Sequence, residues 1–298
     1  MTTTYHAYAE TLTGTTCLIC ETVNPTDAVM CGECSAPLAI VHEAAEQDTK
    51  PQIVSIVGES NVGKTVYLGM LLDMLSQRAG EYEAIPKGAY SIDLQQTVVS
   101  HLAHRVFPPK TPMEANEWYW AYYQVLHRQL DRWIDLVMPD MAGESLAAEV
   151  ATPQTFRVIS NLMTKSAGTI LLVDAAMAAN GSSQPDFFAM KMMSYIDSML
   201  AGKRNQKIET PTAVVLCKSD YCPECFDDPR KFAQANLNRL WNFCQSRFAK
   251  VEFFGSSVVG SLGYATIEEG QEQFVVPVPL HVAVRGVLEP FSWITEQL

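Results

Sequence analysis

Three apolar runs, at residues 53–57, 168–174 and 212–217, alternate along the chain with segments of helical periodicity. Near-continuous runs of this kind are typical of strands that are buried on both faces of a parallel sheet. The first run leads into a segment whose leucines recur every three or four positions, which predicts one apolar face of a helix: Leu68, Leu71, Leu72 and Leu75. Strands that alternate with helices in this way predict an α/β fold with a mostly parallel sheet.

The other patterns continue this alternation to the end of the chain. An aromatic-rich stretch at 118–129, the stretch before Asp140 and the residues at 250–257 predict further strands. Prolines make residues 107–112 a stiff extended segment. Helices are expected at 91–106, at 186–201, at 229–248 and from about Leu288.

The first strand and helix are joined by a glycine-bracketed loop of the GxxxxGK[ST] pattern, which starts at Gly58 and ends at Thr65. Glycines permit a tight turn whose backbone N–H groups face an anion, and the following helix N-terminus adds partial positive charge. A lysine at Lys64 reaches the terminal phosphates of a bound nucleotide, and the hydroxyl of Thr65 is a ligand for Mg²⁺. The nucleotide-binding residues expected here are Gly58, Glu59, Ser60, Asn61, Val62, Gly63, Lys64, Thr65 and Val66.

Acidic residues outnumber basic ones, 33 to 21, and give a formal net charge of −12. Nucleic acids and anionic membranes both bind to basic faces, so we expect neither as a partner. No apolar run is long enough to span a bilayer, and the first ten residues lack the basic and apolar regions of a secretory signal. We therefore expect a cytoplasmic protein, in which the eight cysteines are metal ligands or free thiols in preference to disulfides.

Four of those cysteines form two CxxC pairs, Cys17 with Cys20 and Cys31 with Cys34, separated by ten residues. Two such pairs close a tetrahedron of thiolates around Zn²⁺, and four sulfurs leave no open position for chemistry. Redox-active pairs or disulfides are the alternatives. The spacing favours a structural zinc ribbon, which depends on the metal for most of its folding free energy because its loop is too short to hold a core.

A second set of polar residues follows the strand that ends before Asp140, in the order Asp140-Met-Ala-Gly143-Glu144. Downstream of a phosphate-binding loop, such an aspartate holds Mg²⁺, commonly through water, while the glycine N–H meets the γ-phosphate. The glycine is needed because a side chain would block the approach of the backbone.

In their order, these motifs resemble those of P-loop GTPases of the translation-factor and Ras-like class. GESNVGKT corresponds to the first signature of that class, DMAGE to the third, CKSD at 217–220 to the fourth and Ser256-Ser257 loosely to the fifth. The resemblance spans residues 52–298 and implies a three-layer sandwich that binds GTP or GDP with Mg²⁺. It also implies a conformational switch that hydrolyses GTP.

The same resemblance implies roles for individual residues. Asp220 accepts hydrogen bonds from guanine, Lys218 lies over the base, and Ser256 and Ser257 contact the guanine oxygen through their backbone. Thr111 is the expected switch threonine, which joins Thr65 and Asp140 as a Mg²⁺ ligand. The expected catalytic residues are Lys64, Thr111, Gly143 and Glu144.

The cysteine pattern with Asn24 at its centre resembles zinc fingers of the Ran-binding-protein type, although Thr15 replaces the usual tryptophan. A zinc ribbon followed by VGESNVGKT, PPKTP and DMAGE is similar to the bacterial double-GTPase group, which occurs in predicted conflict or defence operons beside partner proteins. This implies a ribbon at residues 1–38 that docks a protein or covers the larger domain. Residues 39–51 follow as a linker or short helix, and residues 52–298 form the GTPase-like domain.

Two departures from the class leave alternatives open. Cys217 replaces the usual asparagine or threonine before Lys218, which leaves an ATPase as an alternative. Glu144 replaces the usual glutamine and repels the γ-phosphate, so hydrolysis is expected to be slow or to need a partner. A scaffold that binds nucleotide without turnover is the alternative from another functional class. A second metal site is conceivable at Cys217, Cys222, Cys225 and Cys244, with free thiols favoured.

Overall fold

A seven-stranded sheet forms the centre of the protein in the computed structural model, which describes residues 14–46, 50–200, 206–269 and 272–298. The strands β6, β3, β7, β8 and β9 are parallel neighbours, whereas β5 runs antiparallel to both β4 and β6. The predicted mostly parallel sheet is therefore confirmed. In spatial order the strands are β4 (Tyr82–Pro86), β5 (Trp120–His127), β6 (Arg132–Pro139), β3 (Gln52–Gly58), β7 (Ser166–Asp174), β8 (Thr212–Cys217) and β9 (Val251–Gly255).

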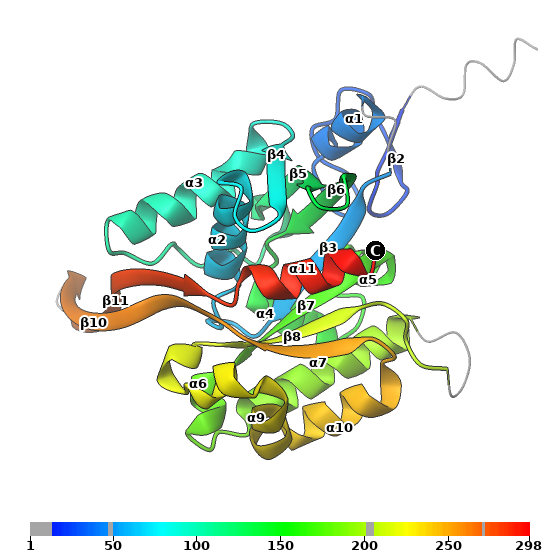
Figure 1. Ribbon diagram of the computed structural model, residues 1–298. Coiled ribbons are helices and arrows are strands. Elements are labelled where there is room, and N and C mark those ends of the chain that lie inside the picture. The colour runs from blue at the N-terminus through cyan, green and yellow to red at the C-terminus, as the bar shows by residue number, and fades with distance from the viewer. Residues whose placement is uncertain (1–13, 47–49, 201–205, 270–271) are drawn as a thin grey trace, which may run out of the picture.

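Helices cover both faces of this sheet and give the three layers that the sequence predicts (Figure 1). Alternate residues of β3 point to opposite faces, so Val54 and Ile56 belong to one core and Ile53 and Val57 to the other. The first core packs against α2 (Lys64–Ser76), α3 (Tyr90–Ala103) and α11 (Leu288–Glu296). The second packs against α4 (Gly143–Ala151), α5 (Arg157–Lys165), α6 (Ala175–Ala179), α7 (Gln184–Leu200), α8 (Glu224–Asp227), α9 (Pro229–Asn236) and α10 (Asn238–Arg247).

The helix predicted at 229–248 is two helices, α9 and α10, and that expectation was wrong. Leu237 leaves the helical conformation between them, with φ −129° and ψ 47°. The cause is a tertiary contact, because the buried carboxylate of Asp186 in α7 accepts hydrogen bonds from the backbone N–H groups of Arg239 and Leu240. An aspartate from another helix therefore caps the N-terminus of α10, and sequence-local reasoning has no access to such a partner.

The N-terminal cysteine segment packs directly on the larger domain. It contains β1 (Thr15–Thr16), β2 (Val23–Asn24) and α1 (Ala39–Glu46), so a short helix is found at the start of the segment expected as a linker or helix. Lys165 of α5 donates to the carbonyl of Leu18 at 3.1 Å, and Arg157 of α5 forms an ion pair with Glu33. Ile40 of α1 is buried in the same core as the sheet. The division at residues 38 and 51 remains a prediction.

A long antiparallel hairpin follows β9, and sequence patterns did not predict it. Its strands are β10 (Ser257–Glu269) and β11 (Glu272–Arg285), and it extends away from the body of the molecule (Figure 1). Prolines at 277 and 279 obscure its strand signal, since proline is excluded from most strand interiors. Two short 3₁₀ helices, Ala115–Glu117 and Ser219–Tyr221, complete the structure. Over the described residues, no helix is both long and apolar enough to cross a membrane.

Candidate functional site

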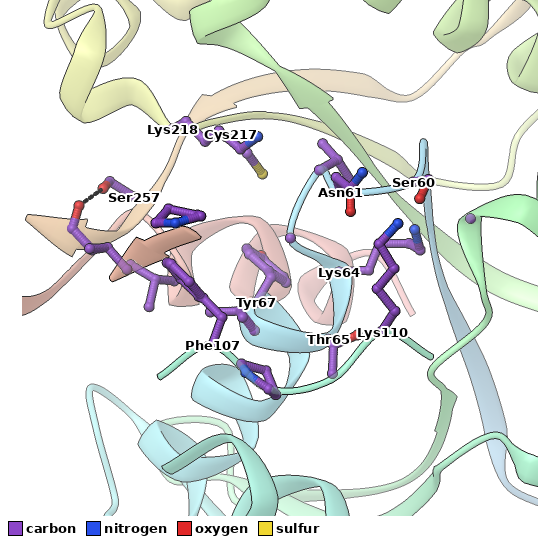
Figure 2. A pocket seen from close by; sticks show the side chains of 18 of the residues that line it. Ser60, Asn61, Lys64, Thr65, Tyr67, Phe107, Lys110, Cys217, Lys218 and Ser257 are labelled. Atoms are coloured by element: carbon purple, nitrogen blue, oxygen red, sulfur yellow. Dashed lines mark hydrogen bonds between the residues drawn. The ribbon is translucent and has the colours of Figure 1, made fainter. Parts of the chain in front are cut away.

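A pocket of about 540 Å³ opens where β3, β6 and β8 end, and it gathers residues from six separate parts of the sequence (Figure 2). Carboxyl ends of parallel strands at one edge of an open sheet are the usual place for a ligand. Thr65 and Lys110 lie toward one end of the pocket, and Lys218 and Ser257 lie toward the other. The expected residues that line it are Ser60, Asn61, Val62, Gly63, Lys64, Thr65, Val66, Thr111, Gly143, Glu144, Lys218, Asp220, Ser256 and Ser257. Gly58, Glu59 and Asp140 are not part of this lining.

Lys64 is held inside the glycine-bracketed loop by two backbone carbonyls. Its Nζ donates to the carbonyl of Gly58 at 3.1 Å and to that of Glu59 at 2.9 Å. Burial lowers the pKa of Lys64 to about 8, because the charged form loses hydration. Gly63 adopts φ 103° at the start of α2, a left-handed conformation that side chains rarely accept. The loop thus presents a buried ammonium and a helix N-terminus to the pocket.

Thr65, Thr111 and Asp140 converge next to this lysine. The Thr65 hydroxyl lies 3.0 Å from the Thr111 hydroxyl and donates to Asp140 Oδ1 at 3.3 Å, while Thr111 donates to Asp140 Oδ2 at 2.7 Å. Burial raises the pKa of Asp140, and the hydrogen bond from Thr111 opposes this rise. The three side chains offer only oxygen atoms, which is the donor set that suits Mg²⁺. The residues expected to hold Mg²⁺ are therefore close enough to share one ion.

The start of α4 lies against the phosphate-binding loop. A Cβ at Gly143 would lie 2.4 Å from the backbone nitrogen of Ser60, so only glycine fits there. Glu144 accepts a hydrogen bond of 2.5 Å from the Ser60 hydroxyl and lies 3.7 Å from Lys110. The hydrogen bond from Ser60 is the main cause that lowers the pKa of Glu144. The side chain is therefore an ionised carboxylate at neutral pH, beside the loop.

Two loops meet at the other end of the pocket. Ser257 donates a hydrogen bond of 2.7 Å to the carboxylate of Asp220, and the N–H of Ser219 donates to the carbonyl of Ser256. Lys218 has φ 59° and forms an ion pair of 2.5 Å with Asp174, at the end of β7. Cys217 is buried, and burial raises the pKa of its thiol to about 12, so the thiol is neutral. The residues of the expected base-recognition motifs are therefore brought together.

Sequence reasoning missed the apolar part of the pocket. Phe107 lines it from the proline-rich segment, Tyr221 from the loop after Asp220, and four side chains come from the hairpin: Val258, Val259, Leu262 and Pro277. The aromatic residue before the two prolines was a usable signal for Phe107. The hairpin residues carry no motif and reach the pocket only through the tertiary fold.

The cysteines of the ribbon converge as expected. The four sulfur atoms of Cys17, Cys20, Cys31 and Cys34 lie within 4.8 Å of one another, a separation that suits a tetrahedral Zn²⁺ thiolate site. Asn24 orients the site from outside, because it accepts from the N–H of Gly32 at 2.9 Å and its Nδ2 lies 3.5 Å from the sulfur of Cys31. Such outer contacts fix the ligands of metal sites.

The other four cysteines do not form a second metal site. The sulfurs of Cys222 and Cys225 are 2.8 Å apart, but Cys217 belongs to the core on one face of the sheet and Cys244 to the core on the other. Among the residues that the structure describes, the ribbon cysteines form the only convergent set of three or more potential ligands.

Comparison with known families gives a match to Double-GTPase 1 over residues 55–219, more than half of the 298 residues. The chain belongs to the Double-GTPase 1 family. The matched segment of this Double-GTPase 1 protein holds the phosphate-binding loop, the Asp140 and Gly143 motif and the start of the base-recognition motif. The ribbon and the hairpin lie outside the match. No curated protein matches the sequence.

Several solved structures of GTPases are distantly similar. The signal recognition particle receptor SRb-GTP/SRX complex from Chaetomium thermophilum is 14% identical over 72% of this chain and 93% of that chain, with a TM-score of 0.39. The Arl6 BBS3 small GTPase from Trypanosoma brucei, bound to GppNp, is 14% identical over 83% of this chain and 96% of that chain, with a TM-score of 0.37. The S. cerevisiae Ski7 GTPase-like domain, bound to GDP and phosphate, is 15% identical over 70% of this chain and 43% of that chain, with a TM-score of 0.40.

Proposed function

We propose that this Double-GTPase 1 protein binds GTP with Mg²⁺ and hydrolyses it as a conformational switch. The observation that carries the proposal is the convergence of Thr65, Thr111 and Asp140 beside the buried ammonium of Lys64. A phosphate chain along residues 59–65 would meet backbone N–H groups, a helix N-terminus and this ammonium, all of which stabilise negative charge. Mg²⁺ held by the three oxygen-bearing residues would add neutralisation of the β- and γ-phosphates.

Guanine is the base that the far end of the pocket suits. The carboxylate of Asp220 is fixed by Ser257 at 2.7 Å, so it is oriented to accept two hydrogen bonds from the N1 and N2 groups of guanine. Adenine offers no matching pair of donors at these positions, so this carboxylate disfavours ATP. Lys218 forms its ion pair with Asp174 through its terminal ammonium. A movement of this flexible end alone would place the aliphatic part of the side chain over the base.

The switch would act through the segments at 107–118 and 140–150. Besides the contact between Thr111 and Asp140, the Ser145 hydroxyl donates to the carbonyl of Met113 at 2.8 Å; within the first segment, Trp118 donates to the carbonyl of Pro112 at 2.9 Å. The two segments are therefore tied to each other as well as to the loop. Loss of the γ-phosphate would release one contact of each segment, which is how nucleotide switches change the surface offered to partners.

We propose that the proteins that respond to this switch are partner proteins of a bacterial conflict or defence system. The support is the resemblance of the motif order to the bacterial double-GTPase group, together with the family match over residues 55–219. The ribbon, attached to α5 by Lys165 and Arg157, is a second surface for such partners.

A nucleotide-binding scaffold is the second candidate, and Glu144 is the observation that favours it. The hydrogen bond from Ser60 lowers the pKa of Glu144, so its carboxylate is a weak base, and its negative charge repels the γ-phosphate; both properties disfavour the activation of an attacking water. Tight GTP binding without turnover, alone or with partners, would select the scaffold.

The decisive experiment measures nucleotide and metal in the purified chain, followed by GTP turnover and competition between GTP and ATP. We expect bound guanine nucleotide, turnover that needs Mg²⁺, and loss of turnover in Lys64→Ala. The matched control is Lys231→Ala, which removes an exposed lysine of α9 that does not line the pocket. GTP turnover that survives Lys64→Ala would overturn the proposal.

A further inference from the structure

The side chains of the β10 and β11 hairpin fall into three groups. Val258, Val282 and Val284 pack against the core that contains α2 and α11. Val258, Val259, Leu262 and Pro277 line the pocket. Others are open to solvent, such as Tyr264 at 73% and Leu280 at 48% exposure. The second group is the one placed to touch a ligand.

Both ends of the hairpin are attached to elements that form the pocket. Ser257, the first residue of β10, donates to the carboxylate of Asp220. After β11, the carbonyl of Val287 accepts a 2.9 Å hydrogen bond from the hydroxyl of Tyr67, which lies two residues after Thr65 in α2. A displacement of the hairpin base would therefore disturb both the base-recognition loop and the helix that follows the phosphate-binding loop.

The pairing of the two strands is irregular only beside the pocket. Its register shifts between Ser257 and Val259, between Val259 and Ser261, and between Ser261 and Leu262, and is then regular as far as the pair of Glu269 and Glu272. Irregular pairing of this kind turns side chains away from simple alternation and bends the strand. Val259 and Leu262, which a regular strand would point to opposite faces, both line the pocket.

We propose that the base of this hairpin is a wall of the nucleotide pocket that retains the bound nucleotide, with Leu262 and Pro277 as positioning residues over its base and ribose. This inference rests on the proposed function. The wall continues from Ser257, which donates to Asp220 and lies at the end of the pocket away from Thr65, so the wall belongs to the base end (Figure 2). An apolar wall stabilises the bound nucleotide because it removes water from the flat face of the base. Such a contact affects affinity chiefly through the dissociation rate.

Release of tritiated GDP from the full-length protein tests the wall, because tritium adds no bulk near the hairpin. In Leu262→Ala we expect release to be faster by about tenfold, the loss expected when nearly two buried methylene groups stop touching the ligand. Leu280→Ala is the matched control, since Leu280 lies on the same hairpin, is 48% exposed and does not line the pocket. Its release rate should stay within about twofold of the unaltered chain.

Pro277→Ala is the second variant, because Pro277 is exposed and its replacement should not prevent folding. We expect release to be faster by about threefold, with an unchanged thermal unfolding temperature in the absence of nucleotide. Release at the unaltered rate in both Leu262→Ala and Pro277→Ala would overturn the wall, as would an equal acceleration in Leu280→Ala. Failure of the unaltered chain to bind GDP would overturn the proposed function itself.

Discussion

The hydroxyl of Thr111 donates a hydrogen bond of 2.7 Å to Oδ2 of Asp140, although the two residues are 29 positions apart in sequence. Asp140 is 1% exposed and directly follows the strand β6, whereas Thr111 lies in a segment without regular secondary structure. A buried carboxylate is costly unless it is hydrogen-bonded. The contact therefore fixes the proline-rich segment at the end of the sheet where a divalent ion would bind.

We predict that Thr111→Ala lowers GTP hydrolysis by roughly 100-fold, because a positioned oxygen ligand near the γ-phosphate is lost. GDP affinity should change little, since GDP lacks the γ-phosphate that the switch threonine would help to hold. Thr111→Ser keeps the hydroxyl and should retain most of the activity. Single-turnover kinetics at saturating Mg²⁺ measures the difference, and equal rates in the alanine and serine variants would rule out the hydroxyl.

The contact between Ser257 and Asp220 predicts the base preference. Asp220→Ala should reduce the preference for GTP over ATP by about 100-fold, the loss of two hydrogen bonds to a charged group. Ser257→Ala should reduce it by about tenfold, because the carboxylate remains but is no longer oriented. Competition of GTP and ATP for one fluorescent nucleotide measures both. Undiminished GTP preference in Asp220→Ala would contradict the assignment of this end of the pocket to the base.

Glu144 predicts an unusual gain of activity. Glu144→Gln keeps an oxygen that accepts from Ser60 but removes the charge, so hydrolysis should rise by about tenfold as repulsion of the γ-phosphate is relieved. Glu144→Ala removes the charge and the hydrogen bond together and separates the two effects. A slower Glu144→Gln enzyme would show that the carboxylate itself assists hydrolysis.

The same residue makes a prediction about pH. The hydrogen bond from Ser60 lowers the pKa of Glu144 below its ordinary value, so the carboxylate stays ionised throughout the range from about pH 6 to pH 8. Protonation would occur only when the pH falls through this lowered pKa. Acidification within that range therefore should not reproduce the gain of Glu144→Gln, and the ratio of the variant's rate to that of the unaltered protein should stay constant.

The ribbon cysteines predict a stability effect that depends on metal. Cys34→Ala should abolish zinc binding and lower the free energy of unfolding by more than about 4 kcal/mol, because the ribbon shares its buried core with the sheet. Cys244→Ala is the matched control, since Cys244 is equally buried but has no neighbouring ligands. Zinc content and denaturant unfolding measure the two effects. Full zinc content in Cys34→Ala would contradict the four-thiolate site.

Much of the site followed from local chemistry in the sequence. The loop from Gly58 to Thr65 has a fixed spacing, because its glycines and its lysine each meet a steric or electrostatic need of a phosphate chain. The spacing of the four ribbon cysteines is fixed in a similar way, because their sulfur atoms must form a tetrahedron around one metal ion. In both cases neighbours in sequence act as neighbours in space, so the pattern itself indicates the chemistry.

Other features depended on contacts that no local pattern encodes. Asp186 of α7 ends α9 by capping α10, and Asp220 receives its hydrogen bond from a serine 37 positions away. The second set of cysteines looked similar to a metal site, but the sheet separates Cys217 from Cys244. Distance in space decided each of these outcomes.

By itself, the sequence determined the α/β alternation of the main strands and helices, the phosphate-binding loop and the ribbon, since apolar periodicity and fixed spacings reflect forces within a few residues. Only the tertiary structure decided that Thr111 reaches Asp140 and that Leu262 and Pro277 of the hairpin border the pocket. Those placements follow from how the sheet packs and how β10 and β11 pair, and packing joins residues that the chain keeps far apart.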